Sequence, residues 1–81
     1  MSTARSAVQG RVKLFGRSYC HLCEEMADAL RRLGIDFEEI DVDSDPRLDE
    51  LYGADVPVLQ AEDGKELCRH RLTPEAIRRL S

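Results

Sequence analysis

Apolar and polar residues follow one another in an order that predicts short strands and short helices in turn. The alternation in residues 12–15 predicts a strand that ends at Gly16, and residues 35–42 predict a second strand. Gly34 stands where a glycine commonly ends a helix. Between the two strands, the apolar residues recur at the three- and four-residue spacing of one helix face: Leu22, Met26, Leu30 and Leu33.

Two helix starts in the second half of the chain share one signal, a capping residue followed directly by proline. Asp45 precedes Pro46, and Thr73 precedes Pro74. The side chain of the first residue can accept a hydrogen bond from the first helical turn, and proline suits the first helical position. We therefore expect a short helix that ends at Gly53 and a last helix that reaches residue 80.

Two further strands are predicted between these helices. Residues 56–59 form a short apolar run, and Asp63-Gly64 is a strong hairpin signal that returns the chain through residues 66–68. The expected order is β-α-β-α-β-β-α, in which both βαβ steps imply parallel strands and the hairpin adds an antiparallel pair. This order predicts an α/β fold with a mixed four-stranded sheet flanked by helices.

Length and composition fit one small globular domain. The chain has 81 residues, of which 42% are hydrophobic and 35% are charged, as is typical of folded chains rather than disordered ones. Residues 1–10 read as a flexible leader ahead of a single domain at 11–81. No apolar run approaches the roughly 18 residues of a membrane helix, so no membrane partner is expected.

The charge of the chain limits the classes of partner that it can bind. A formal net charge of −4 argues against nucleic acid. Acidic residues are concentrated in 38–50, and basic residues are more frequent from residue 65 onward. We interpret both as solvated surfaces, with docking of a protein partner as the alternative. Nothing in the sequence requires an oligomer, so we expect a monomer.

The cysteines carry the candidate chemistry. Cys20 and Cys23 form a CxxC pair where the first strand gives way to the first helix. The free N–H groups of a helix start stabilise a thiolate, and two thiols at this spacing can close and reopen a disulfide. With Cys68 the chain has three cysteines. A secreted scaffold held by disulfides usually carries a larger and even number, so we expect a reduced, cytoplasmic chain. Cys68 itself is expected to be a half-buried, inert thiol.

These motifs resemble glutaredoxins and the wider thioredoxin-like fold, most of all small bacterial glutaredoxin-like domains. The resemblance covers residues 11–80 and lies in the CxxC after the first strand, Val56-Pro57 at the third strand, and the element order. It implies a thioredoxin-like βαβαββα fold, a cis peptide at Pro57, and a Val56 backbone that pairs with the substrate. It also implies substrate contacts for Arg17, where glutaredoxins commonly carry a lysine that helps hold glutathione, and for the aromatic Tyr19.

Two departures from the glutaredoxin pattern concern glutathione and the reactivity of the thiols. His21 replaces the proline that usually follows the first cysteine, and residues 68–71 lack the Gly-Gly pair that lets the backbone approach glutathione. The missing glycines argue against a tight glutathione site. A protonated His21 would stabilise the Cys20 thiolate and make the disulfide more oxidising, whereas a fully solvated His21 would have little influence.

The leading hypothesis is dithiol–disulfide exchange. The resemblance implies that Cys20 is the nucleophile and Cys23 the resolving thiol, acting on a disulfide-containing protein or a glutathione mixed disulfide. The fold carries no bound cofactor on this interpretation. Glutathione or a thioredoxin-type reductase would return the electrons, and the sequence does not choose between them.

Two alternatives come from other classes of protein. A zinc or iron–sulfur module would use Cys20, Cys23 and Cys68, with His21 or His70 as a further ligand. Against this reading, the third cysteine lies far along the chain without a second closely spaced pair, and the cis-proline would block metal from the thiols. A redox-silent domain would keep the fold for partner contacts alone. Outside the metal reading, His70 is expected to be exposed and to lack an acid or base partner.

Overall fold

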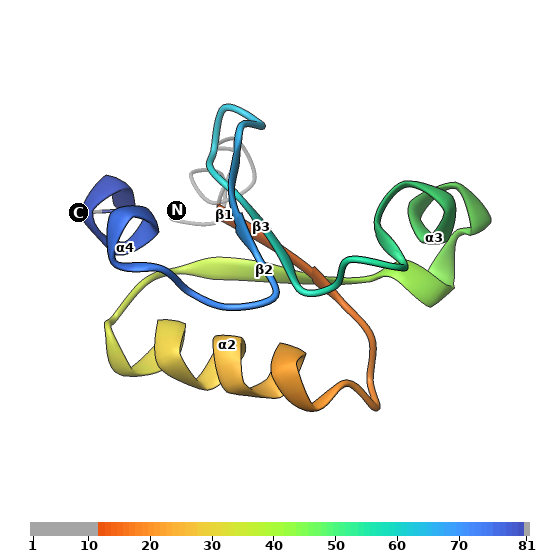
Figure 1. Cartoon of the computed structure of the whole chain (residues 1–81), viewed down its shortest axis with the longest axis horizontal. Helices are drawn as coiled ribbons and strands as arrows, with labels where there is room; N and C mark the ends of the chain where they lie inside the picture. Colours follow the sequence, from red (N-terminus) through yellow and green to blue (C-terminus); the bar gives the residue numbers. More distant parts are fainter. Residues whose placement is uncertain (1–11, 81) are drawn as a thin grey trace, which may run out of the picture.

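A mixed sheet of four strands organises the chain, which the computed structural model describes over residues 12–80. The leader expected at residues 1–10 lies outside the described residues. The sheet order is β2-β1-β3-β4, with β2 parallel to β1 and the other neighbours antiparallel (Figure 1). The strands are β1 (Val12–Gly16), β2 (Phe37–Asp41), β3 (Val58–Gln60) and β4 (Glu66–Arg69).

Helices lie on both faces of this sheet. They are α2 (His21–Arg32), the short 3-10 helix η1 (Val42–Ser44), α3 (Pro46–Tyr52) and α4 (Pro74–Leu80). Figure 1 shows α3 at one end of the sheet, well apart from α2 and α4. No helix in the described part of the chain is long and apolar enough to span a membrane.

Two apolar clusters lie on opposite faces of the sheet, because successive side chains of a strand point to opposite sides. Leu14 of β1 belongs to the larger cluster, which joins the sheet to α2 and α4. The next residue, Phe15, belongs to the smaller cluster with Val42 and Val58, and its ring stacks on Tyr52 of α3 with centroids 4.4 Å apart. The larger cluster buries Val12, Leu14, Met26, Ala27, Leu30, Leu59, Cys68 and Ala76.

The direction of β3 corrects the expected topology. The sequence order predicted two parallel βαβ steps, but β3 runs antiparallel to β1. The connection through η1 and α3 does not cross the sheet, because Tyr52 of α3 packs on Phe15 near the end of β1. Since η1 and α3 stay at the end where β2 stops, β3 begins at that end and runs back beside β1.

The helix boundaries follow the capping signals of the sequence. Asp45 accepts a hydrogen bond from the first turn of α3 at 2.9 Å, and Thr73 accepts one from the first turn of α4 at 3.1 Å. Gly34 follows α2 with φ at +74°, a left-handed conformation that glycine adopts readily. The expected start of α3, the expected start of α4 and the expected end of α2 are therefore confirmed.

Two strand boundaries and one helix face differ from expectation. β2 begins at Phe37, opposite the first residue of β1, rather than at residue 35. β3 begins at Val58 rather than at residue 56, because proline has no N–H for the ladder. On α2, Leu22 and Leu33 are 39% and 47% exposed. Met26 and Leu30 are buried as expected, and Cys23 and Ala27 complete the buried face of α2.

Candidate active site

Cys20 caps the N-terminus of α2. Its backbone is extended, with φ at −96° and ψ at 116°, and its Sγ accepts the backbone N–H of Cys23 at 3.2 Å. The N–H groups and dipole of a helix start favour negative charge at this place. Cys20 is also partly exposed to solvent. The Cys20 sulfur is therefore accessible to a substrate at a helix N-terminus.

Cys23 is buried and holds its proton. Burial and a hydrogen bond to the Cys20 side chain raise the pKa of Cys23 to about 12, although a backbone hydrogen bond from Arg17 opposes the rise. Both cysteines are free thiols in this structure. The two sulfurs of the CxxC pair thus lie in unlike surroundings, with one available for attack and the other protected.

This asymmetry predicts a distinct pH dependence for the modification of Cys23. With a pKa near 12, roughly one Cys23 in 100,000 is a thiolate at pH 7. The alkylation rate of Cys23 should rise about tenfold per pH unit without levelling off below pH 11. Iodoacetamide pulses between pH 6 and 11, read by peptide mass spectrometry, measure this rate. A plateau below pH 9 would contradict the protected state of Cys23.

Gly16 makes room for Cys23 at the end of β1. A Cβ atom at residue 16 would lie 2.9 Å from the Cys23 sulfur and 3.1 Å from its Cβ. Real Cβ atoms essentially never come so close, so a side chain here would displace the thiol. The sequence interpretation used Gly16 only as the end of a strand. Its place directly ahead of the CxxC loop was the signal that could have linked it to the thiol pair.

The active-site loop, residues 17–20, is fastened to the rest of the molecule through Arg17. Its carbonyl accepts the N–H of Cys20 at 3.2 Å. Its Nη2 donates to Asp49 Oδ1 at 2.6 Å and lies 3.3 Å from Asp43 Oδ1. Arg17 also lies over the ring of Tyr19, which is 76% exposed. The sequence predicted Arg17 and Tyr19 as substrate contacts but missed both aspartates, which come from η1 and α3.

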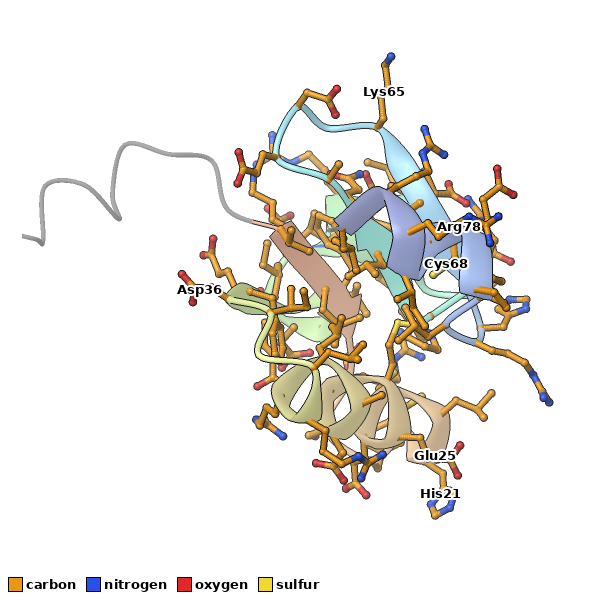
Figure 2. The ribbon with its side chains drawn as sticks, turned by 90° about the vertical axis from the view of Figure 1, so that its left-hand side faces the viewer. His21, Glu25, Asp36, Lys65, Cys68 and Arg78 are labelled. Carbon is orange, nitrogen blue, oxygen red and sulfur yellow. The ribbon has the colours of Figure 1, made fainter. Side chains whose placement is uncertain are left out.

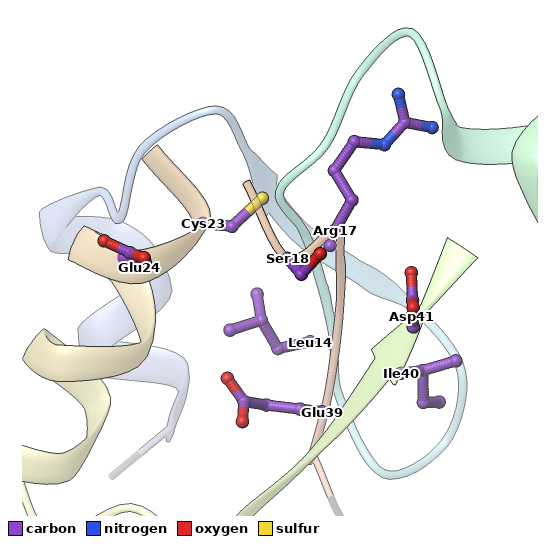
Figure 3. Close-up of a pocket in the computed structure, with 9 residues that line it drawn as sticks. Leu14, Arg17, Ser18, Cys23, Glu24, Glu39, Ile40 and Asp41 are labelled. Atoms are coloured by element: carbon purple, nitrogen blue, oxygen red, sulfur yellow. The ribbon is translucent and has the colours of Figure 1, made fainter. Parts of the chain in front are cut away.

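A cavity of about 260 Å³ opens beside this loop (Figure 3). Arg17 and Cys23 line it together with three carboxylates from α2 and β2. The carboxylates belong to Glu24, Glu39 and Asp41. One side of the thiol pair is therefore acidic.

Val56 and Pro57 leave the sheet at the same end as the CxxC loop. Phe15 pairs with Val58 in antiparallel register, so the residues just before Val58 emerge beside those just after Phe15. The Val56–Pro57 peptide bond is cis, and the Pro57 side chain is fully buried. The carbonyl of Pro57 accepts the N–H of His70 at 2.7 Å, which joins this loop to the end of β4.

Charged side chains contact Asp55, which lies just before Val56 and Pro57. Arg69 donates to Asp55 Oδ2 at 2.6 Å and to both carboxylate oxygens of Glu66 at 2.6 and 2.7 Å. His70 has φ at +74°, and its Nε2 lies 3.7 Å from Asp55 Oδ1. The expectation that His70 has no acid partner was wrong, because the hairpin brings it beside Asp55 from fifteen positions away.

His21 and Cys68 lie in opposite kinds of surroundings, one at the surface and one in the core. Figure 2 shows His21 next to Glu25 on the outer side of α2, and the two side chains lie 3.3 Å apart. His21 is 83% exposed, and its influence on Cys20 stays a prediction. Cys68 is more deeply buried than expected, in the cluster between the sheet and α4. Burial raises the pKa of Cys68, so this thiol is expected to be inert.

The described residues offer no third ligand to the metal-binding alternative. Within residues 12–80, no three His, Cys, Asp or Glu side chains are grouped so that they could hold a metal ion. Cys68, the third cysteine of that hypothesis, instead belongs to the apolar cluster beside Ala76.

A four-stranded mixed sheet with a CxxC at the start of its long helix defines a glutaredoxin-like protein of the thioredoxin-like fold. The sequence model of the family described as Glutaredoxin-like domain (DUF836) matches residues 11–80, and the chain belongs to this family. No match is found among curated proteins.

Solved structures agree with this assignment. The chain is similar to protein Ne2328 from Nitrosomonas europaea, with 38% identity, a TM-score of 0.77, and coverage of 90% of this chain and 93% of that one. It is similar to protein XcR50 from X. campestris at 32% identity and a TM-score of 0.67, covering 83% and 87%. A glutaredoxin from Archaeoglobus fulgidus matches at 25% identity and a TM-score of 0.62, covering 93% and 88%.

Proposed function

We propose that this protein is a thiol–disulfide oxidoreductase in which Cys20 is the nucleophile and Cys23 the resolving thiol. The observation that supports this most is the pairing of a partly exposed sulfur at a helix N-terminus with a buried, protonated sulfur three residues further along the chain. The first arrangement favours a thiolate, and the second keeps a thiol in reserve.

The reaction proceeds in two exchange steps. The Cys20 thiolate attacks one sulfur of a substrate disulfide, a mixed disulfide forms, and the other substrate sulfur leaves as a thiolate. Cys23 then gives up its proton and attacks the Cys20 sulfur. The second substrate sulfur leaves, and the Cys20–Cys23 disulfide remains. The substrate gains two electrons, which are those that the two cysteines lose.

The surroundings of the pair support a role for Val56 and Pro57 in placing the substrate. Both residues emerge at the end of the sheet that carries the CxxC loop, where a free backbone edge can pair with an extended substrate segment. We propose disulfide-containing proteins or small mixed disulfides as substrates, with glutathione or a thioredoxin-type reductase as the source of electrons. A reducing compartment such as the cytoplasm suits this direction of exchange.

A redox titration tests the proposal. The protein, first treated with a chelator, is equilibrated in graded mixtures of reduced and oxidised glutathione, trapped with an alkylating agent, and analysed by mass. We expect a reversible Cys20–Cys23 disulfide with Cys68 free at every potential. A Cys68→Ala variant, as the matched control, should give the same midpoint. A stable glutathione adduct on Cys20 would contradict the resolving role of Cys23, and a pair that stays reduced in every mixture would contradict the function.

A further inference from the structure

The guanidinium of Arg17 already forms ion pairs with carboxylates of the same chain. Both Asp49 and Asp43 face its Nη2, at 2.6 and 3.3 Å, and only 20% of the Arg17 side chain is exposed. The Asp43 and Asp49 side chains are 43% and 56% exposed, so these ion pairs are partly screened by solvent and depend on salt. A carboxylate that arrives on a substrate must therefore compete with two that are attached to the protein.

The C-terminal end of α3 is shaped for this contact. Gly53 follows the helix, and a Cβ atom there would collide with the Asp49 carboxylate and lie 2.6 Å from the Asp49 carbonyl oxygen. Only a residue without a side chain leaves space for the Asp49 carboxylate in its observed position. This requirement is independent of the ion pair itself, and it concerns the same carboxylate oxygen, Asp49 Oδ1, that contacts Arg17.

Arg17 is near enough to the thiols for its neutralisation to matter. Its carbonyl binds the N–H of Cys20, and its positive charge acts on Cys23. Without the aspartates, this guanidinium would attract an anionic group beside a disulfide that approaches Cys20. With them, the same region is acidic, because three more carboxylates line the cavity next to Arg17.

We propose that Asp49, supported by Asp43, is a specificity-determining residue that selects against disulfides with a carboxylate close to the sulfur. The proposal rests on the exchange function proposed above. Disulfides that are neutral or cationic near the reacting bond escape this selection, because they make no use of the Arg17 charge. Asp49 acts through Arg17 and takes no part in the bond exchange.

The test compares two disulfides of different charge on the same reduced protein. Glutathione disulfide carries carboxylates, whereas bis(2-hydroxyethyl) disulfide is neutral. The second-order rate of forming the Cys20–Cys23 disulfide is measured with each in wild type and in Asp49→Asn. We expect the ratio of the glutathione disulfide rate to the neutral disulfide rate to rise by about two- to fivefold in Asp49→Asn at low salt, and to fall back as salt increases.

The matched control is Glu50→Gln, which removes one negative charge from the next position of α3, where no contact with Arg17 is found in the described residues. Its ratio should stay near that of wild type. Because both rates come from the same protein, a loss of stability in either variant cancels in the ratio. An unchanged ratio in Asp49→Asn, or an equal rise in Glu50→Gln, would overturn the selection by Asp49 while leaving the exchange function intact. If the wild-type protein reacts with neither disulfide, the exchange function fails, and the selection proposed on it fails with it.

Discussion

Replacing Cys20 with serine should reduce disulfide exchange to the uncatalysed level. A serine hydroxyl at the start of α2 cannot form a thiolate-like nucleophile, and Cys23 is not a substitute because burial raises its pKa to about 12. The measurement is the mass of the protein after mixing with excess bis(2-hydroxyethyl) disulfide. The Cys20→Ser variant should gain mass no faster than an unstructured peptide thiol reacts with the same reagent.

Replacing Cys23 with serine should instead stop the reaction halfway. Cys20 still attacks, but no neighbouring thiol displaces the substrate, so the protein accumulates a mixed disulfide on Cys20. A Cys68→Ala variant is the control and should complete the reaction as wild type does. If Cys20→Ser forms a mixed disulfide on Cys23 at the wild-type rate, the roles of the two thiols are reversed.

A side chain at residue 16 should both destabilise the protein and impair the second exchange step. In Gly16→Val the new side chain meets the Cys23 sulfur, because even its Cβ atom would lie 2.9 Å away. Overpacking of this kind costs about 1–3 kcal/mol of folding free energy. The displaced Cys23 is also poorly placed to attack the Cys20 mixed disulfide, which should therefore persist longer than in wild type.

Two measurements separate these effects of Gly16→Val. Denaturant unfolding gives the free energy of unfolding, and quenched mass spectra give the lifetime of the mixed disulfide. Gly16→Ala should change both in the same direction by smaller amounts. Ala54→Val, which adds two methyl groups at an exposed position, should change neither. A normal lifetime in a folded Gly16→Val protein would show that Cys23 tolerates the added volume.

The sequence predicted most elements of the fold because its local signals act within a few residues. Asp45 and Thr73 cap their helices as expected, and Gly34 ends α2. The direction of β3 was not predictable from element order alone. It depends on whether α3 crosses the sheet or stays at its end, and that is decided by the packing of Tyr52 on Phe15, two residues that lie far apart in the sequence.

The candidate site was predictable in its thiols and much less so in their surroundings. The CxxC spacing is local, so Cys20 and Cys23 could be placed at a helix start from the sequence. The partners of Arg17 come from positions 43 and 49, and the partner of His70 from position 55. Such pairs depend on how η1, α3 and the hairpin pack in three dimensions, and no local sequence pattern predicts that packing.

The burial of Cys68 gives the protein a built-in reporter of its own opening. This thiol belongs to the cluster between the sheet, α2 and α4, so a reagent reaches it only when that part of the core separates. Under native conditions its labelling rate, divided by the rate of an unstructured thiol, gives the fraction of molecules that are open at any time. Cys68, which takes no part in the proposed chemistry, thus allows the stability of the intact protein to be followed by thiol labelling without denaturant.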